Sequence, residues 1–171
     1  TFDRIHILTK PHLDEATELV ASVVEEYAIK NHIPYLRHFR YATEKVLFVS
    51  IGGDGTMLGA MRTSINYKNS TILGLNTGTL GFLADEVTEN LPVLLDNIRN
   101  EKDVLLEERM SLIGSCLVNG EPYGNDVNAI NEFTLVGAST NSPVVTEVHI
   151  NERFVSKQMG SGVLVSTSTG S

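Results

Sequence analysis

The chain has 171 residues, of which 42% are hydrophobic and 20% charged, a composition typical of a globular protein with a buried core. Its net charge of −8 argues against duplex nucleic acid as a partner, because proteins that bind nucleic acid usually present a basic face. No apolar run approaches the roughly 20 residues of a membrane span, and no signal-peptide pattern is visible, so we expect no membrane partner. Cys116 is the only cysteine, which excludes an internal disulfide and favours the reducing cytoplasm.

Strands and helices alternate in the first part of the chain. Continuous apolar runs predict strands at residues 4–9, 46–51 and 71–75. Helical spacing of apolar residues predicts helices at 13–31, 56–65 and 88–99. Thr88 is the expected N-cap of the last helix. The alternation indicates an α/β domain with a parallel, three-layer sheet, which we assign to residues 1–102.

The pattern changes to short strands after this domain. Strands are predicted at 111–118, 129–136, 144–150, 154–158 and 163–166. Asn119-Gly120, directly after the first of these strands, is a strong hairpin turn. We therefore expect residues 103–171 to form the start of a mostly antiparallel β domain.

The most informative segment is Gly-Gly-Asp-Gly-Thr at residues 52–56, between a predicted strand and a predicted helix. Glycine lets backbone N–H groups approach a ligand closely, and a strand, a glycine turn and a helix start together form a phosphate-binding geometry. A turn that only held phosphate would exclude a negative charge, so Asp54 is a candidate for a chemical role. The structural alternative is that Asp54 caps the following helix.

A second glycine-containing loop follows the next strand, at residues 76–82, and includes Gly78 and Gly81. Open α/β sheets bind ligands at the carboxyl ends of their strands, so we expect both loops at one edge of the sheet. Neither loop matches the Walker A or the Gly-x-Gly-x-x-Gly pattern. Taken alone, the second loop is equally compatible with an ordinary glycine-rich turn.

Two polar segments stand out in the second half. Asn131-Glu132 interrupts an apolar stretch, and Ser-Thr-Ser-Thr-Gly-Ser occupies residues 166–171. Their side chains could bind ribose hydroxyls, an adenine edge or phosphate, but a solvent-facing strand and a polar terminus are equally open interpretations. The five histidines show no metal-ligand spacing, and we expect no resident metal site.

Four motifs, taken in order, resemble the NAD kinase family, which phosphorylates the adenosine-ribose 2′-hydroxyl of NAD with ATP to make NADP. They lie at 52–58, 78–83, 131–132 and 166–171. The similarity is greatest to the bacterial branch. It implies an α/β domain followed by a β domain, a cytoplasmic enzyme, and NAD and ATP as partners, with Mg²⁺ bound to ATP.

The resemblance also implies roles for single residues. Asp54 would be the general base for the ribose hydroxyl and would lie with Gly55 against the dinucleotide. Gly52, Gly53, Gly55 and Thr56 would form the phosphate loop. Members of the NAD-binding set outside this loop would be Phe82 near the adenine, Asn131 and Glu132 on the ribose and adenine side, Ser161 on the nicotinamide side, and Ser166 and Thr169 in the pocket wall.

The sequence departs from the family pattern at Ser161, which stands where the family has an aspartate on the nicotinamide side, and at Ser168, which replaces a proline. Family members also continue well beyond the last motif, so the chain resembles a member truncated at its C-terminus. Val163 and Val165 should then be exposed or covered by a second copy, and we expect a homo-oligomer, either a dimer or a tetramer.

Two other functions stay open at this point. A lipid kinase of the diacylglycerol type shares the Gly-Gly-Asp-Gly segment, although it would need a membrane-facing surface that this sequence does not show. A non-catalytic dinucleotide-binding fragment is the other alternative, and Ser161 together with the early end of the chain favours it.

Overall fold

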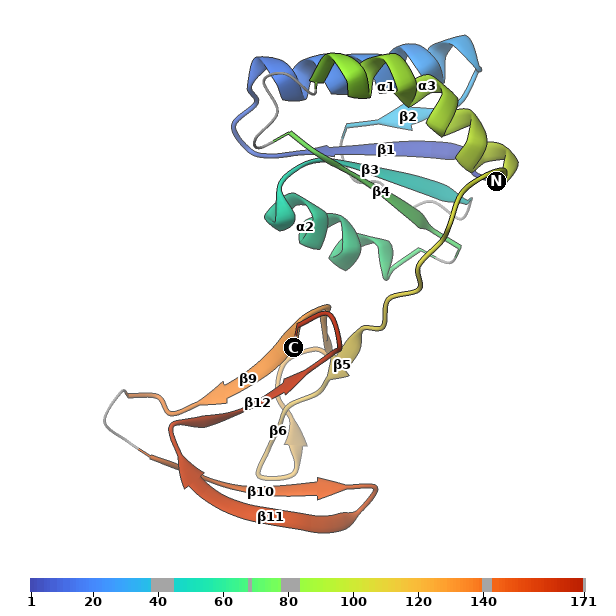
Figure 1. Cartoon of the computed structure of the whole chain (residues 1–171). Helices are drawn as coiled ribbons and strands as arrows, with labels where there is room; N and C mark the ends of the chain where they lie inside the picture. The colour runs from blue at the N-terminus through green and yellow to red at the C-terminus, as the bar shows by residue number, and fades with distance from the viewer. Residues whose placement is uncertain (38–44, 68, 78–83, 140–142, 171) are drawn as a thin grey trace. The chain divides into compact units, whose positions relative to one another are not determined.

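The computed structural model describes residues 1–37, 45–67, 69–77, 84–139 and 143–170. The chain divides into two compact units, Thr1–Glu107 and Glu108–Ser171. The boundary expected from the sequence, after residue 102, lies in the irregular segment just before this division. The first unit runs from blue to yellow in Figure 1, and the second continues to red.

The first unit is built on a four-stranded sheet with the order β2-β1-β3-β4, in which every pair is parallel. The strands are β1 (Arg4–Thr9), β2 (Tyr35–Leu36), β3 (Val46–Gly52) and β4 (Thr71–Asn76). All seven residues of β3 are buried. Its sequence is apolar except for Ser50 because helices cover both faces of this inner strand.

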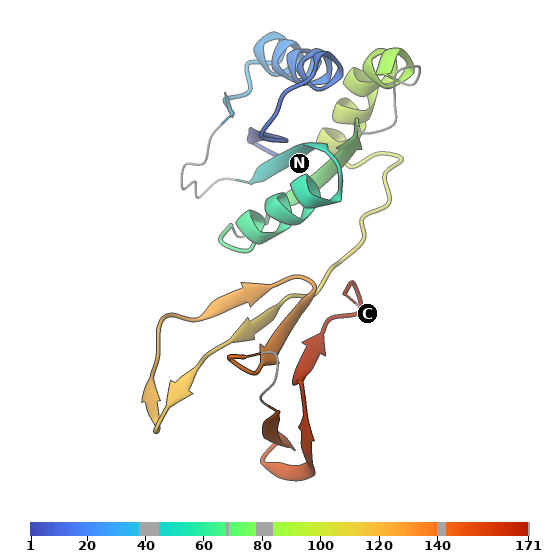
Figure 2. The same ribbon diagram turned by 90° about the vertical axis from the view of Figure 1, so that its left-hand side faces the viewer.

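Among the described residues, three helices cover this sheet: α1 (Glu15–Lys30), α2 (Asp54–Ser64) and α3 (Ala84–Asn100). Figures 1 and 2 show α1 and α3 on one face and α2 on the other. The main core lies under α1 and α3 and includes fully buried Ile5, Leu47, Val49, Val24 and Leu95. A smaller cluster on the opposite face joins Phe48 to Tyr67, whose rings meet edge-on with centroids 5.1 Å apart.

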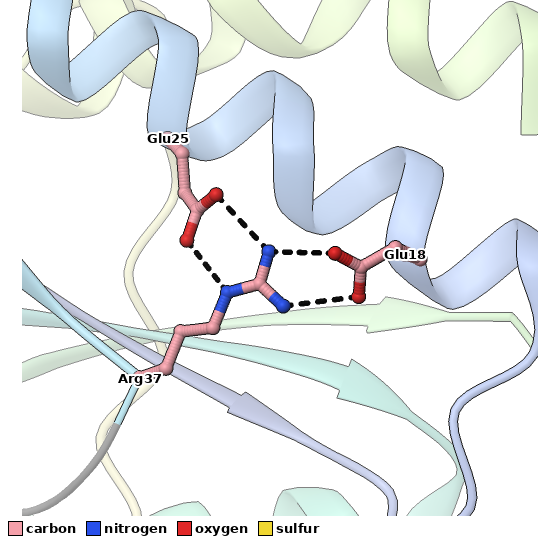
Figure 3. A network of polar contacts seen from close by, with 3 residues as sticks. All are labelled: Glu18, Glu25 and Arg37. Carbon is pink, nitrogen blue, oxygen red and sulfur yellow. Dashed lines mark hydrogen bonds and ion pairs between the residues drawn. The ribbon is translucent and has the colours of Figure 1, made fainter.

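A three-residue ionic network holds the short edge strand β2 against α1 (Figure 3). Arg37 follows β2 directly, and its guanidinium donates two hydrogen bonds to Glu18, both 2.9 Å, and two to Glu25, at 2.6 and 3.0 Å. Such paired bonds fix the orientation of the guanidinium as well as its position. The Arg37 guanidinium lowers the pKa of the Glu18 carboxyl below its ordinary value.

The second unit consists of short antiparallel pairs. Its strands are β5 (Leu112–Gly114), β6 (Leu117–Val118), β7 (Glu121–Pro122), β8 (Val127–Ala129), β9 (Glu132–Val136), β10 (Val144–Ile150), β11 (Arg153–Gly160) and β12 (Gly162–Ser166). The pairs are β5 with β8, β6 with β7, β9 with β12 and β10 with β11. A parallel α/β part followed by antiparallel strands confirms the fold class expected from the sequence.

Little of the second unit is buried. Among its described residues, only Ala129, Ile130 and Thr167 are buried. Val165 is 56% exposed, as the sequence predicted, whereas Val163 is half-buried. The strands of this unit therefore form their ladders without enclosing a large apolar core of their own.

Several element boundaries predicted from the sequence are wrong. Helix α3 begins four residues before Thr88, so Thr88 lies inside the helix and is not its N-cap. The predicted strand 129–136 breaks at Ile130 and Asn131. The carbonyl groups of these two residues accept hydrogen bonds from Thr167, so tertiary contacts replace the regular ladder there.

Candidate functional site

The candidate site in the first unit lies at the carboxyl edge of the sheet, where β3 and β4 end side by side. Gly52 is paired with Asn76 in the strand register, and the Thr77 amide donates to the Gly52 carbonyl at 3.4 Å. The two loops that the sequence places at one edge therefore start next to each other. Gly78, Gly81 and Phe82 fall outside the described residues.

Gly52 makes the sharp turn from β3 into α2. Its φ of +155° is a backbone conformation that other residues rarely adopt. A Cβ atom at this position would lie 2.4 Å from the Thr56 hydroxyl oxygen and 3.0 Å from the Thr56 Cβ. Glycine is required here because the strand end and the first turn of α2 approach so closely.

Gly53 and Gly55 have a different role, because no described residue occupies the space beside them at the start of α2. Gly53 is the N-cap residue of this helix, in an extended conformation and with no side chain to occupy the helix end. A Cβ at either glycine would have no described neighbour within 4 Å beyond the adjoining chain. The first amide groups of a helix lack intrahelical acceptors, so this end of α2 can bind an anion such as phosphate.

Asp54 is the first residue of α2 and is exposed. The alternative that Asp54 caps the helix is wrong, because Gly53 occupies the cap position and no side chain makes a cap hydrogen bond. The helix begins two residues earlier than the sequence pattern indicated, which moves Asp54 into its first turn. A carboxylate at this position can be reached by the hydroxyl group of a ligand bound at the helix end.

Two buried threonines tie the second loop to α1. Asp14 caps α1 by accepting a hydrogen bond from the Thr17 amide at 2.9 Å. The Thr17 and Thr77 hydroxyl oxygens lie 3.0 Å apart, and both side chains are buried. Sequence reasoning missed this contact, because no local pattern relates two threonines 60 positions apart. It fixes the start of the second loop beside Gly52.

The second unit brings its two polar motifs together. Glu132 of β9 is paired with Ser166 of β12, and the Thr167 amide donates to the Asn131 carbonyl at 2.8 Å. Asn131 is half-buried, whereas Glu132 is exposed. These segments are more than 30 positions apart in the sequence, so their contact is a property of the fold.

Thr167 organises the turn after β12, although no pattern in the sequence distinguishes it from its neighbours. Its buried hydroxyl donates to the Ile130 carbonyl at 2.5 Å and accepts from the amides of Thr169 and Gly170 at 3.1 and 3.3 Å. Arg109 donates to the Thr169 hydroxyl at 3.3 Å. Ser166 thereby directly precedes a fixed turn that contains Thr169.

Ser161 lies apart from this cluster. It is exposed in the corner between β11 and β12, and its carbonyl accepts a hydrogen bond from the Gly137 amide at 3.3 Å. The whole of β12 separates Ser161 from Ser166, roughly 17 Å at the rise of an extended strand. The structure therefore does not bring Ser161 beside Asn131 or Glu132.

The described part of the chain contains no group of three or more His, Cys, Asp or Glu side chains that could hold a metal ion. Nor does it contain a helix long and apolar enough to cross a membrane. Mg²⁺ in nucleotide sites is held by one or two carboxylates and by the phosphates themselves. A metal ion that arrives with a nucleotide therefore needs no cluster of protein ligands.

Residues 25–104 match the family described as the ATP-NAD kinase N-terminal domain. An NAD kinase of Cytophaga hutchinsonii is 32% identical over 173 residues, which is 97% of this chain and 58% of that protein. The chain belongs to the NAD kinase family. An NAD kinase of Pasteurella multocida is 36% identical over 125 residues, 73% of this chain and 40% of that protein.

The fold of this family member is also found among solved structures. Yeast NADH kinase complexed with NADH superposes with a TM-score of 0.73 and 17% sequence identity, over 99% of this chain and 59% of that chain. The chain spans only part of the length of these relatives: 40% of the Pasteurella multocida protein and 58% of the Cytophaga hutchinsonii protein. It spans 61% of an NAD kinase from Clostridium beijerinckii. The resemblance inferred from the four motifs is thus confirmed at the level of the family.

Proposed function

We propose that this chain acts in an ATP-dependent NAD kinase, which transfers the terminal phosphoryl group of ATP to the adenosine-ribose 2′-hydroxyl of NAD. The observation that carries the proposal is the placement of Asp54 in the first turn of α2, beside two glycines whose Cβ positions no described residue approaches. This arrangement offers a proton acceptor and phosphate-binding amides at one point. Membership of the NAD kinase family supports the choice of substrates.

In the proposed reaction, Asp54 accepts the proton of the 2′-hydroxyl while the ribose oxygen attacks the terminal phosphorus. The bond between that phosphorus and the bridging oxygen breaks, and ADP leaves. Phosphoryl transfer depends mainly on positioning and on electrostatic stabilisation, which the amides of Gly53 and Gly55 would provide. Mg²⁺ enters as part of the Mg-ATP substrate and reduces the charge of the phosphates.

The polar cluster of the second unit is proposed to hold NAD. Asn131 and Glu132 would bind the ribose and adenine side, with Ser166 and Thr169 in the wall of the same pocket. The pairing of Glu132 with Ser166 supports this assignment, because it makes one surface of two distant motifs. Phe82 near the adenine and Ser161 on the nicotinamide side complete the proposed set.

The proposal also includes the oligomeric state and the cellular location of the enzyme. Apolar side chains are exposed on the second unit, including Met159 at 73% and Phe154 at 61%. Surfaces of this kind usually meet a partner, and we propose a homodimer or homotetramer. The single cysteine, Cys116, suits a reducing cytoplasm.

A dinucleotide-binding protein without turnover is the second candidate. The described part of the second unit has few buried residues, so little packed core holds its polar cluster in place. This observation favours the second candidate. A site that is held loosely can bind a ligand and still fail to align it for transfer.

The test is an assay of NADP formation from NAD and Mg-ATP, combined with calorimetry of NAD binding on the same preparation. Formation of NADP supports the kinase. Binding of NAD without NADP identifies the second candidate, and the absence of both overturns the proposal. A parallel reaction with diacylglycerol vesicles and labelled ATP identifies a lipid kinase if the label enters the lipid.

A further inference from the structure

A lysine stands at the same sheet edge as the glycine turn. Lys10 directly follows β1, whose last residue Thr9 is paired with Ile51 of β3. The residue after Ile51 is Gly52, so the backbone at Lys10 lies about one strand spacing, roughly 4.8 Å, from the start of the turn. The carboxyl ends of β1, β3 and β4 thus place Lys10, Gly52 and Asn76 in one row.

The glycine turn itself supplies no positive charge. Residues 52–56 offer backbone amides, one hydroxyl and the carboxylate of Asp54, and the lysine of a Walker A loop has no counterpart. Bound triphosphate carries several negative charges, and a lysine serves as a point charge for them. Lys10 brings a positively charged side chain to this edge of the first unit. Lys30 and Arg62 lie in the last turns of α1 and α2, and the Arg37 guanidinium is already paired with two carboxylates.

The Lys10 side chain is held in a chain of contacts that leads to the turn. Its ammonium group donates to one carboxylate oxygen of Asp14, and the other oxygen caps α1 at the Thr17 amide. The Thr17 hydroxyl meets the Thr77 hydroxyl, and the Thr77 amide donates to the Gly52 carbonyl. The Lys10 side chain is only 28% exposed, and its ion pair with Asp14 holds the ammonium group near the start of α1.

We propose that Lys10 binds the β- and γ-phosphates of the donor nucleotide, with Asp14 as its partner when no nucleotide is bound. A phosphate oxygen replaces the Asp14 oxygen as the acceptor of the ammonium group. Lys10 then offsets the charge that Asp54 brings to the same edge, and the pair supplies a cation for the phosphates and a base for the hydroxyl. This assignment rests on the proposed kinase function, because it takes the anion at the turn to be the donor nucleotide.

The test is calorimetry on the full chain with Mg-ATP and with adenosine monophosphate, in the absence of NAD. Lys10→Met should weaken Mg-ATP binding by about 10- to 100-fold, the order expected for a lost charge-assisted hydrogen bond. Its affinity for the monophosphate should stay within about twofold, because that ligand lacks the β- and γ-phosphates. Lys10→Arg should retain most of the Mg-ATP affinity, and Lys30→Met is the matched control with the same loss of charge.

The outcomes separate this inference from the proposed function. Unchanged Mg-ATP binding in Lys10→Met overturns the inference, as does an equal loss for both ligands or no Mg-ATP binding by the parent chain. Failure of the parent chain to form NADP, with Mg-ATP binding that still depends on Lys10, overturns the kinase but leaves Lys10 as a phosphate-binding residue. Circular dichroism spectra of the lysine variants verify that each keeps the parent fold.

Discussion

Replacing Gly52 by alanine tests the geometry of the turn that precedes Asp54. The added methyl group would lie 2.4 Å from the Thr56 hydroxyl oxygen, well inside van der Waals contact, and it would require alanine at a φ of +155°. Neither problem is relieved by rotating a flexible side chain, because the Thr56 Cβ is itself only 3.0 Å away. Either the turn or the first turn of α2 must move.

The expected cost has two contributions. A strained backbone and an overpacked contact each cost about 1–3 kcal/mol, so Gly52→Ala should lower the free energy of unfolding by about 3 kcal/mol. Because whole domains are stable by only about 5–15 kcal/mol, the loss should be readily measured. Removing the clashing hydroxyl in the double variant Gly52→Ala/Thr56→Ala should recover about 1 kcal/mol, since the backbone strain and the Thr56 Cβ contact persist.

The assay is urea unfolding followed by circular dichroism at 222 nm, which reports mainly the helices of the first unit. Gly59→Ala is the matched control, because Gly59 lies inside α2 with no described neighbour near its Cβ position. Alanine should stabilise the helix there by about 0.5–1 kcal/mol, a change of opposite sign. Equal effects of the two substitutions would show that Gly52 is not held against Thr56.

Three further predictions concern hydrogen bonds away from the turn. Burial raises the pKa of Tyr27 to about 12, and its hydroxyl donates to Asp96 at 2.7 Å. The folded pKa therefore lies above the unfolded value of about 10. The stability that the neutral hydroxyl contributes is complete below about pH 10 and is lost between about pH 10 and 12. Unfolding measured across that range should therefore show a smaller loss of stability in Tyr27→Phe than in the parent chain. Thr167→Val removes a buried hydroxyl with three hydrogen bonds and should lower the free energy of unfolding by about 1–3 kcal/mol in urea titrations, whereas an unchanged midpoint would contradict its role in the turn. Glu132→Ala should weaken NAD binding about tenfold in calorimetry if its carboxylate accepts a ligand hydrogen bond, and unchanged affinity would place that carboxylate outside the site.

The sequence predicted the elements whose cause is local or repetitive. The apolar run of β3 identified an inner parallel strand, because only a strand covered on both faces is buried at every residue. The glycines at 52–55 identified the turn, and the topology of parallel sheets predicted that the loop after β4 would start beside it.

The remaining features depend on contacts between distant segments, which leave no local pattern. The hydroxyl pair of Thr17 and Thr77 and the turn organised by Thr167 belong to this class. The start of α2 was misplaced because glycine is a weak capping signal in sequence, although Gly53 takes that position in the structure. Lys10 could have been found from the sequence, since it follows a strand predicted to end at the same edge as the glycine turn.

The central claim is that Asp54 is the base of a phosphoryl transfer, and single-turnover NADP formation by Asp54→Asn measures it most directly. Asparagine keeps the size of the side chain but cannot accept the hydroxyl proton. The rate should fall by about 10²–10⁴-fold, the usual range for loss of a general base, while NAD affinity measured by calorimetry stays within a few fold. A rate near that of the parent chain, with NAD bound normally, would contradict the role of Asp54 and leave its carboxylate without a part in the chemistry.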